Sequence, residues 1–206
     1  GRHFIVEGTL NIEGVTLTGG YGDLLNGLPF SGPDKYYVAG AVLVKGGLAT
    51  FISCALTGNS GSPSDAQVGM EVGLDAYHIE GGAVVVDAGG AAIFTNCTLN
   101  GNAANAKEDI YEIIGGAVAV WVDSSATFIS CVLNGNSVNS ADANADGDPL
   151  SIYGGAVHVP KGGSAIFIDC TLSSNPDGLR GGAVSVYGGN AAFTRCTLSG
   201  NTATNT

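Results

Sequence analysis

The chain has few positive charges. Seven Lys and Arg stand against 18 Asp and Glu in 206 residues, which gives a formal net charge of −11. So few cations cannot form a surface that follows a phosphate backbone, which argues against nucleic acid as a partner. The negative balance favours solubility, binding of divalent cations and repulsion from anionic membranes.

Several common patterns are missing. No run approaches 18 consecutive apolar residues, so we expect no transmembrane segment. No apolar stripe has the 3.6-residue period of a helix, which argues against helical repeats. No Cys-x-x-Cys pair offers the spacing of a zinc site. The chain starts at Gly1 without a signal-like segment, so we expect a processed product or a piece of a longer chain.

Glycine, by contrast, is abundant, with 34 residues and no collagen period. Many of these glycines belong to a phrase that recurs along the chain: Gly-Gly-Ala-Val, then Ala-x-Phe, then Cys-x-Leu-x-Gly-Asn. Self-similarity of this kind indicates a repeat architecture. We count six repeats of 20–22 residues, the first of them degenerate, at residues 1–20, 39–59, 81–102, 115–136, 154–175 and 181–201.

Each repeat contains three short runs with the composition of β-strands, separated by Gly-rich corners. Three strands per repeat describe one coil of a parallel β-helix. The sequence therefore predicts one all-β domain over residues 1–206, a right-handed single-stranded parallel β-helix (a solenoid) of six coils.

The two-residue period of a strand assigns side chains to faces. Like residues should stack in inward columns, because neighbouring coils lie about 4.8 Å apart. One column is aromatic, one is formed by Leu, one by thiols and one by a corner ladder of Asn amides. Their members are Phe51, Phe94, Phe128, Phe167 and Phe193, with Ile12 continuing them; Leu17, Leu56, Leu99, Leu133, Leu172 and Leu198; Cys54, Cys97, Cys131, Cys170 and Cys196; and Asn59, Asn102, Asn136, Asn175 and Asn201.

The outward positions of the first strand are mostly uncharged. The sequence predicts two outward columns there, Ala41, Ala83, Ala117, Ala156 and Ala183 in one and Leu43, Val85 and Ala119 in the other. On the second strand of each repeat, Asp169 and Arg195 share a column and are predicted to pair.

The repeat phrase resembles the repeats of polymorphic outer-membrane proteins and related β-helical surface adhesins. The resemblance covers all six repeats, although residues 1–20 have Val15 at the Cys position and lack the final Asn. It implies a secreted, surface-exposed stalk or adhesive structure rather than a defined reaction.

Five insertions leave the repeats at one corner, between the final Asn and the next Gly-Gly, at residues 21–38, 60–80, 103–114, 137–153 and 176–180. They are too apolar for solvated linkers. We expect them to be loops that form a second packed layer, and a partner-binding patch is the alternative.

One insertion carries a candidate cation site. Asp142, Asn144 and Asp146 alternate before a sharp turn at Gly147, as in the first half of a calcium loop, and Asp148 adds a further oxygen ligand. Position 12 of such a loop is Tyr153, where a bidentate Glu would stand. Structural calcium is the one cofactor that the sequence predicts, and a plain Asx-rich turn is the alternative.

Residues for catalysis are not evident. No nucleophile elbow or phosphate-binding loop occurs, and His3, His78 and His158 are isolated in the predicted register. We therefore predict no enzyme. Parallel β-helices also include polysaccharide lyases and hydrolases, so a carbohydrate-binding or carbohydrate-cleaving protein with its site on the loop edge is the alternative.

The sequence also contains a glycosylation sequon and an interrupted array of outward Thr and Ser. Asn96-Cys97-Thr98 is the single glycosylation sequon, and Asn96 is its acceptor. Outward Thr and Ser around the Leu column would suit an ice or crystal surface, but alternate coils interrupt the array.

The two ends of the sequence match each other. Residues 1–8 align position for position with residues 181–188, so the start of one copy could continue the end of another. The expected interface consists of Phe4, Val6, Val184, Val186, Phe193, Leu198 and Asn201. The sequence thus predicts an extracellular or cell-surface structural or adhesive protein. Its partner would be a second copy stacked head to tail or flanking coils of a longer chain, with glycans as a further candidate.

Overall fold

A computed structural model of the chain describes residues 1–25, 35–62, 77–106, 110–140, 151–177 and 180–203. These residues form strands, turns and bends, and no helix occurs among them. The strands assemble into stacked, mostly parallel sheets, so the prediction of an all-β fold of parallel strands is confirmed.

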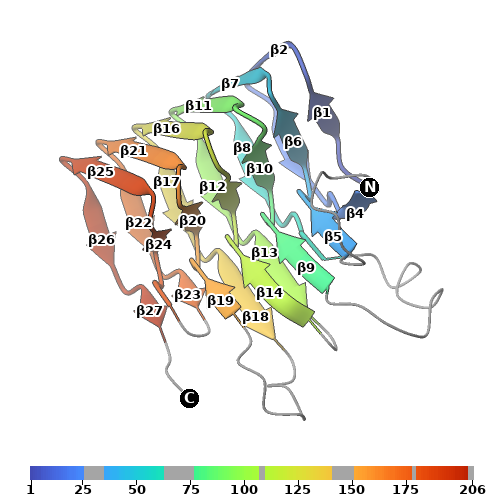
Figure 1. Cartoon of the computed structure of the whole chain (residues 1–206). Helices are drawn as coiled ribbons and strands as arrows, with labels where there is room; N and C mark the ends of the chain where they lie inside the picture. Colours follow the sequence, from blue (N-terminus) through green and yellow to red (C-terminus); the bar gives the residue numbers. More distant parts are fainter. Residues whose placement is uncertain (26–34, 63–76, 107–109, 141–150, 178–179, 204–206) are drawn as a thin grey trace.

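Three six-stranded sheets form the body of the protein, and each receives one strand from every predicted repeat (Figure 1). Sheet A consists of β1 (Phe4–Val6), β6 (Val42–Lys45), β10 (Val84–Asp87), β15 (Val118–Val120), β20 (Val157–Pro160) and β24 (Val184–Tyr187). Sheet B consists of β2 (Thr9–Glu13), β7 (Leu48–Ile52), β11 (Ala91–Thr95), β16 (Ser125–Ile129), β21 (Ser164–Ile168) and β25 (Asn190–Thr194). Sheet C consists of β3 (Thr16–Thr18), β8 (Ala55–Thr57), β12 (Thr98–Asn100), β17 (Val132–Asn134), β22 (Thr171–Ser173) and β26 (Thr197–Ser199).

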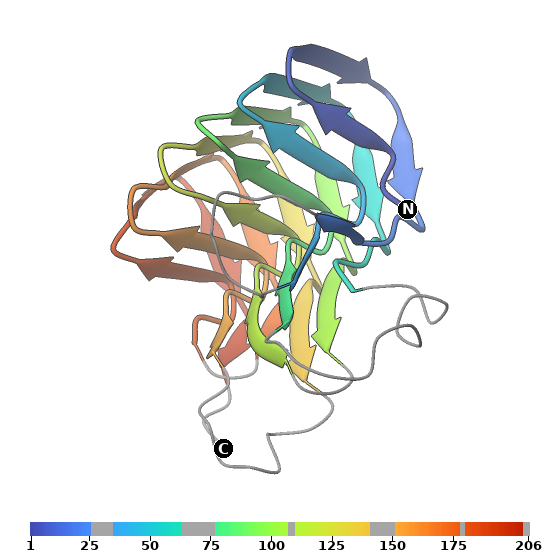
Figure 2. The same ribbon diagram turned by 45° about the vertical axis from the view of Figure 1, so that its right-hand side comes forward.

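The chain passes through sheets A, B and C in turn and then returns to sheet A one strand further along (Figure 2). Equivalent residues of successive repeats are therefore Cα partners: Phe94 lies beside Phe51 on one side and Phe128 on the other. The register expected from the repeat phrase is confirmed.

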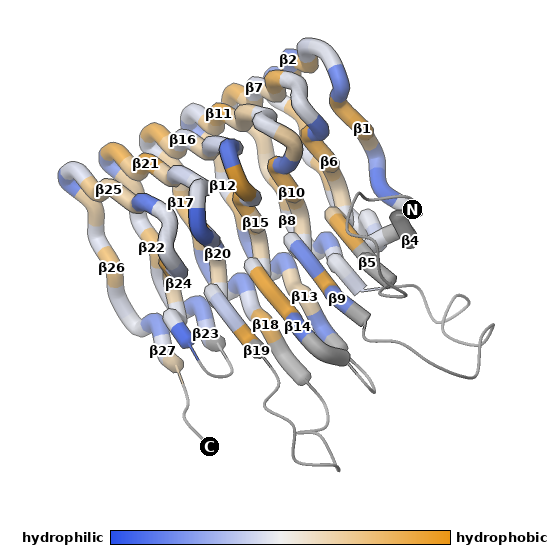
Figure 3. Tube along the Cα trace, in the orientation of Figure 1, coloured by the Kyte–Doolittle hydropathy of each residue, from blue (hydrophilic) through white to orange (hydrophobic). Residues whose placement is uncertain are grey.

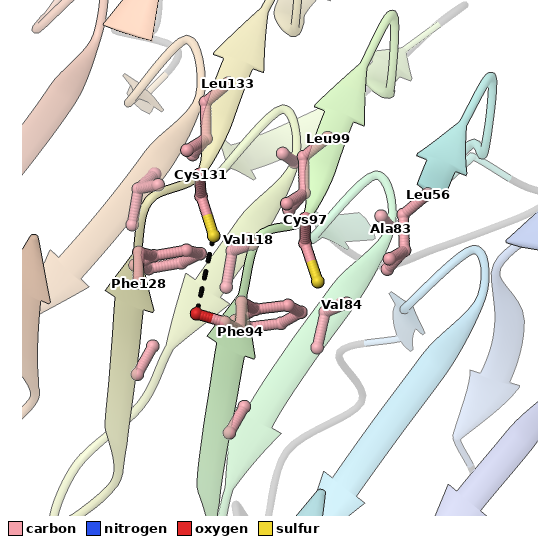
Figure 4. Packing of buried hydrophobic residues seen from close by; sticks show 14 of the residues in the cluster. Leu56, Ala83, Val84, Phe94, Cys97, Leu99, Val118, Phe128, Cys131 and Leu133 are labelled. Carbon is pink, nitrogen blue, oxygen red and sulfur yellow. Dashed lines mark hydrogen bonds between the residues drawn. The ribbon is translucent and has the colours of Figure 1, made fainter. Parts of the chain in front are cut away.

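The interior of the three sheets is one continuous apolar core. The Phe rings stack with centroids 4.7–4.9 Å apart and nearly parallel planes. Each Cys lies beside this aromatic column, as Figure 4 shows for Cys131, whose thiol donates to the carbonyl oxygen of Phe94. All five thiols are unbridged. Contact with Cys170 and Cys97, together with burial, raises the pKa of the Cys131 thiol, so this thiol stays protonated in the core.

The Gly-Gly pair has a steric cause. Gly81 has a positive φ of 57°, a conformation that side chains rarely adopt. A Cβ added to Gly82 would stand 1.9 Å from the carbonyl oxygen of Gly116 in the next repeat. The corner before sheet A therefore needs one glycine for its dihedral angles and one for close approach of neighbouring backbones.

One predicted outward column is wrong. Four of the five residues, Ala41, Ala83, Ala117 and Ala156, are completely buried, and all five belong to the main core. They precede the first residue of each strand, where the chain is still turning at the corner, so strict alternation does not yet apply.

The insertions also differ from the loops that we expected, because their described parts contain strands. Five of them form an outer sheet: β4 (Asp23–Leu25), β5 (Lys35–Val38), β9 (Tyr77–Glu80), β14 (Ile110–Ile114) and β19 (Ser151–Tyr153). Two short pairs, β13 (Ala103–Ala106) with β18 (Ser137–Ser140) and β23 (Pro176–Asp177) with β27 (Thr202–Ala203), complete the fold. β-branched residues such as Ile113 and Ile114, both buried, favour strands there.

The outer sheet covers part of the outer face of sheet A. Val38 and Ile114 of the outer sheet pack against Leu43, Val85 and Ala119 of sheet A in a second apolar cluster. The prediction of a second packed layer is therefore confirmed for the described parts of the insertions. The apolar stretch on β14 is visible in the hydropathy colouring of Figure 3.

Candidate functional site

The predicted cation site lies in the sequence between β18 and β19. Asp142, Asn144, Asp146 and Asp148 lie outside the described residues. Within the described ranges, no group of three or more His, Cys, Asp or Glu side chains is arranged to hold a metal ion. Calcium at this loop stays a prediction.

The residues expected at the assembly interface lie on the two terminal repeats. Val186, Phe193 and Leu198 are 46%, 42% and 50% exposed, although their counterparts in the preceding repeat are fully buried. Val184 and Asn201 are half-buried. The inward columns of sheets A, B and C therefore continue to β24, β25 and β26 and present their last members to solvent.

The opposite end is less open. Phe4 on β1 is half-buried, and Val6 is 5% exposed. Leu10 and Ile12 of β2 are also only partly buried. An apolar edge thus exists at both ends of the three sheets, and it is larger at the C-terminal end.

The Asn ladder is directional. Asn59 donates from its backbone N and from Nδ2 to Oδ1 of Asn102, all at 3.0 Å, and its Nδ2 also lies 3.0 Å from the carbonyl oxygen of Leu17. The same contacts repeat from Asn102 to Asn136 and onward to Asn175 and Asn201. Each amide oxygen therefore accepts from the preceding repeat, and each Nδ2 donates both to the next Asn and back to the Leu carbonyl oxygen of the preceding repeat.

The ladder does not close on itself at the ends. The position of Asn in the first repeat is Gly20, whose backbone N–H donates to Oδ1 of Asn59 at 3.0 Å. In a head-to-tail stack of two copies, the amide donors of Asn201 would meet Gly20, which has no side-chain acceptor. Contact between copies would therefore depend on the apolar columns and on backbone pairing rather than on Asn201.

The glycosylation candidate lies at an exposed corner. Asn96 precedes β12 with a positive φ of 53°, and its side chain is exposed together with that of Thr98. Cys97 between them points into the core, as predicted. Modification of Asn96 stays a prediction.

A buried carboxyl group joins the outer sheet to sheet A, and sequence reasoning missed it. Glu80, at the end of β9, is only 2% exposed, and its Oε2 accepts a hydrogen bond of 2.8 Å from Nε1 of Trp121. Its Oε1 is buried without a hydrogen-bond partner. Burial, opposed by the Trp121 bond and assisted by the charges of Glu112 and Asp87, raises the pKa of Glu80 well above its usual value. A neutral carboxylic acid fits this apolar position.

The histidines are not isolated, contrary to the prediction. Nδ1 of His78 lies 3.2 Å from Oε2 of Glu112 on the neighbouring strand β14. His158 is buried on the outer face of β20, and its ring centroid lies 5.0 Å from that of Tyr153. Burial lowers the pKa of His158 to about 4, against a smaller opposing effect of Glu112. His3 Nε2 contacts the carbonyl oxygen of Thr18.

The predicted pair of Asp169 and Arg195, which directly follow β21 and β25, is present. Arg195 donates two hydrogen bonds to the carboxylate of Asp169, at 2.7 and 2.8 Å. The bidentate contact with Arg195 lowers the pKa of Asp169. Because both side chains are largely exposed, this pair adds little to stability.

Comparison of the chain with models of protein families, with curated proteins and with solved structures finds no match in any of the three. Among the described residues, no helix has the length and apolar character needed to span a bilayer.

Proposed function

We propose that the chain is a non-catalytic structural or adhesive element of the extracellular space or cell surface, built as a right-handed parallel β-helix of six coils. The right hand follows from the strong preference of parallel strand connections for that hand. The location and adhesive character follow from the resemblance of the repeat phrase to polymorphic outer-membrane proteins.

We propose that the β-helix assembles by stacking its C-terminal repeat on a further β-helical coil. One observation carries this idea: the buried columns of Val, Phe and Leu reach the last repeat and become exposed at Val186, Phe193 and Leu198. Parallel strands at the edge of a sheet also offer unpaired N–H and C=O groups to a further strand. The proposed partner is the N-terminal repeat of a second copy, with Phe4 and Val6 over Val184 and Val186, or further coils of a longer chain.

Negative-stain electron microscopy of the purified protein tests this proposal. We expect fibres with an axial repeat of roughly 29 Å, six coil spacings of about 4.8 Å. Val186→Lys should abolish them because it places a charge in the stacked column. Val132→Lys is the matched control: Val132 is 41% exposed on the outer face of β17, so the same change there should leave the fibres intact.

Short rods at every protein concentration would contradict stacking between copies and leave only coils of a longer chain as the partner. A calcium chelator added to the wild-type fibres tests the predicted loop at Asp142–Asp148. Fibres that disassemble in chelator and return with calcium would support a structural ion. Unchanged fibres would remove calcium from the proposal.

A further inference from the structure

A partly exposed aromatic cluster lies where the outer sheet ends. Tyr153 is the last residue of β19, the terminal strand of that sheet, and Tyr187 is the last residue of β24 in sheet A. Their ring centroids are 6.0 Å apart with planes inclined by 40°. Tyr187 is 63% exposed, the largest exposure of any large apolar or aromatic side chain in the described part of the chain.

The two rings differ in exposure, because Tyr153 is partly buried and packs against the second apolar cluster, whereas Tyr187 is exposed. In the middle of sheet A, the outer sheet buries the outward apolar side chains, and Leu43 and Val85 are 2% and 1% exposed. Beyond β19, the outer layer continues only as a bridge between Tyr153 and Arg180 among the described residues. Tyr187 thus lies on an end strand of sheet A, where the covering layer stops; on the other end strand, β1, the outward Ile5 is likewise 59% exposed.

Polar groups surround the rings in fixed positions. The guanidinium carbon of Arg180 stands 5.3 Å from the centre of the Tyr153 ring, and its Nη1 lies 3.5 Å from the Tyr153 hydroxyl. The backbone holds Arg180 there, because its carbonyl oxygen accepts from the N–H of Gly154 at 2.9 Å. His158 also packs against Tyr153, with ring centroids 5.0 Å apart, and its Nδ1 is buried without a hydrogen-bond partner.

The chemistry of this cluster suits a sugar. The exposed ring of Tyr187 can contact the C–H face of a pyranose, and the guanidinium of Arg180 and the hydroxyl group of Tyr153 can bond its hydroxyl groups. A highly anionic ligand is disfavoured, because the protein has a net charge of −11 and Glu112 lies close enough to influence His158. We propose that Tyr153, Arg180 and Tyr187 form a binding site for a neutral oligosaccharide.

The direction of the ligand follows from the register of sheet A. Pro160 is the Cα partner of Tyr187, and Trp121 holds the same position in the repeat before Pro160. Neighbouring strands are about 4.8 Å apart, so these three positions form a line along the stack, in which Trp121 and Pro160 are partly buried and Tyr187 is exposed. An extended glycan would lie on this line, parallel to the long axis of the protein, with Tyr187 as the most exposed contact.

Isothermal titration calorimetry with cello-, xylo-, manno- and chito-oligosaccharides tests the site, with oligogalacturonate as the anionic comparison. We expect at least one neutral series to bind, and Tyr187→Ala to weaken binding at least about tenfold, the order expected for loss of one aromatic contact. Tyr21→Ala is the matched control, because Tyr21 is 46% exposed and far from the cluster in sequence and sheet. This control should bind within about twofold of wild type.

Arg180→Gln tests the polar half of the site and should also weaken binding. Absence of binding to every neutral series, binding to oligogalacturonate alone, or equal affinity of Tyr187→Ala and wild type would overturn the proposal. The titrations are repeated on Val186→Lys, in which stacking should be blocked. Sugar binding by this variant would separate the site from the proposed stacking, so either proposal can fail without the other.

Discussion

The indole N–H of Trp121 donates to the carboxyl group of Glu80, although the two residues lie on different layers and 41 positions apart in the sequence. This bond joins the outer sheet to sheet A beside the second apolar cluster, against which Trp121 packs. Because only one oxygen of Glu80 has a partner, its ionisation is costly, and that cost makes the stability of the protein depend on pH.

Glu80 should destabilise the fold at high pH. Its folded-state pKa is raised above the unfolded value of 4.5, so its contribution is fully present below pH 4.5 and is lost as pH rises through the folded pKa. Glu80→Gln keeps an acceptor for Trp121 and should flatten this decline. Urea denaturation between pH 4 and 9 measures it, with exposed Glu7→Gln as the control. A wild-type decline that persists in Glu80→Gln would show that another group causes it.

His158 should act in the opposite direction. Its pKa falls from 6.5 to about 4 in the folded protein, so its contribution is present above pH 6.5 and is lost as pH falls toward 4. The free energy involved is on the order of 3 kcal/mol, since one pKa unit corresponds to about 1.4 kcal/mol. His158→Leu places at this position the residue found at the equivalent position 43, and it should remove the decrease in stability at low pH. An NMR titration of the imidazole that gives an ordinary pKa would contradict the assignment.

The aromatic column should be far more sensitive in the middle than at the end. Phe128→Ala removes a ring stacked on both sides and should lower the free energy of unfolding by about 3–5 kcal/mol. Phe193→Ala removes the same atoms from a ring that is stacked on one side and 42% exposed. The decrease in the free energy of unfolding for Phe193→Ala, measured by denaturation of the dissociated protein, should be less than half of that for Phe128→Ala. Equal losses would mean that Phe193 is buried in solution by a partner.

Asn136 in the buried ladder and Asn134 on the outer face permit a comparison of the same substitution at two neighbouring positions. Asn136→Ala leaves the backbone N–H and the Nδ2 of Asn102 without their acceptor, which should cost on the order of 2–4 kcal/mol. Asn134→Ala makes the same change two residues earlier, on the outer face, where Asn134 bonds Asn100 and Ser173 and is partly exposed. We expect a loss of about 1 kcal/mol there. Similar losses in thermal or urea denaturation would contradict a special role of the buried ladder.

Contacts between equivalent positions of successive repeats could be predicted from the sequence. Phe51, Phe94 and Phe128 occur at equivalent positions, so their stacking follows from the register alone, and the bidentate pair of Asp169 and Arg195 follows in the same way. The period of two was less reliable at strand ends, where Ala83 precedes β10 and turns into the core.

The insertions were harder to predict because they have no internal repeat. The pairing of His78 with Glu112 depends on how β9 and β14 align, and that alignment contains an irregularity between Ile110 and Glu112. Glu80 gave a small signal, a charged residue at the end of an apolar stretch and directly before Gly-Gly. Its partner Trp121 comes from another repeat, so only the packing of two layers reveals the contact.

The Asn ladder gives the whole stack a polarity. Each amide oxygen faces the N-terminal end of the stack, while the backbone N–H and one Nδ2 N–H of the same residue donate toward the C-terminal end. Two C-terminal faces brought together by a two-fold axis would oppose donors to donors, which disfavours a symmetric dimer of this kind. A fibre built by stacking the terminal repeats should therefore be polar. Its two ends would be chemically distinct and would grow at different rates.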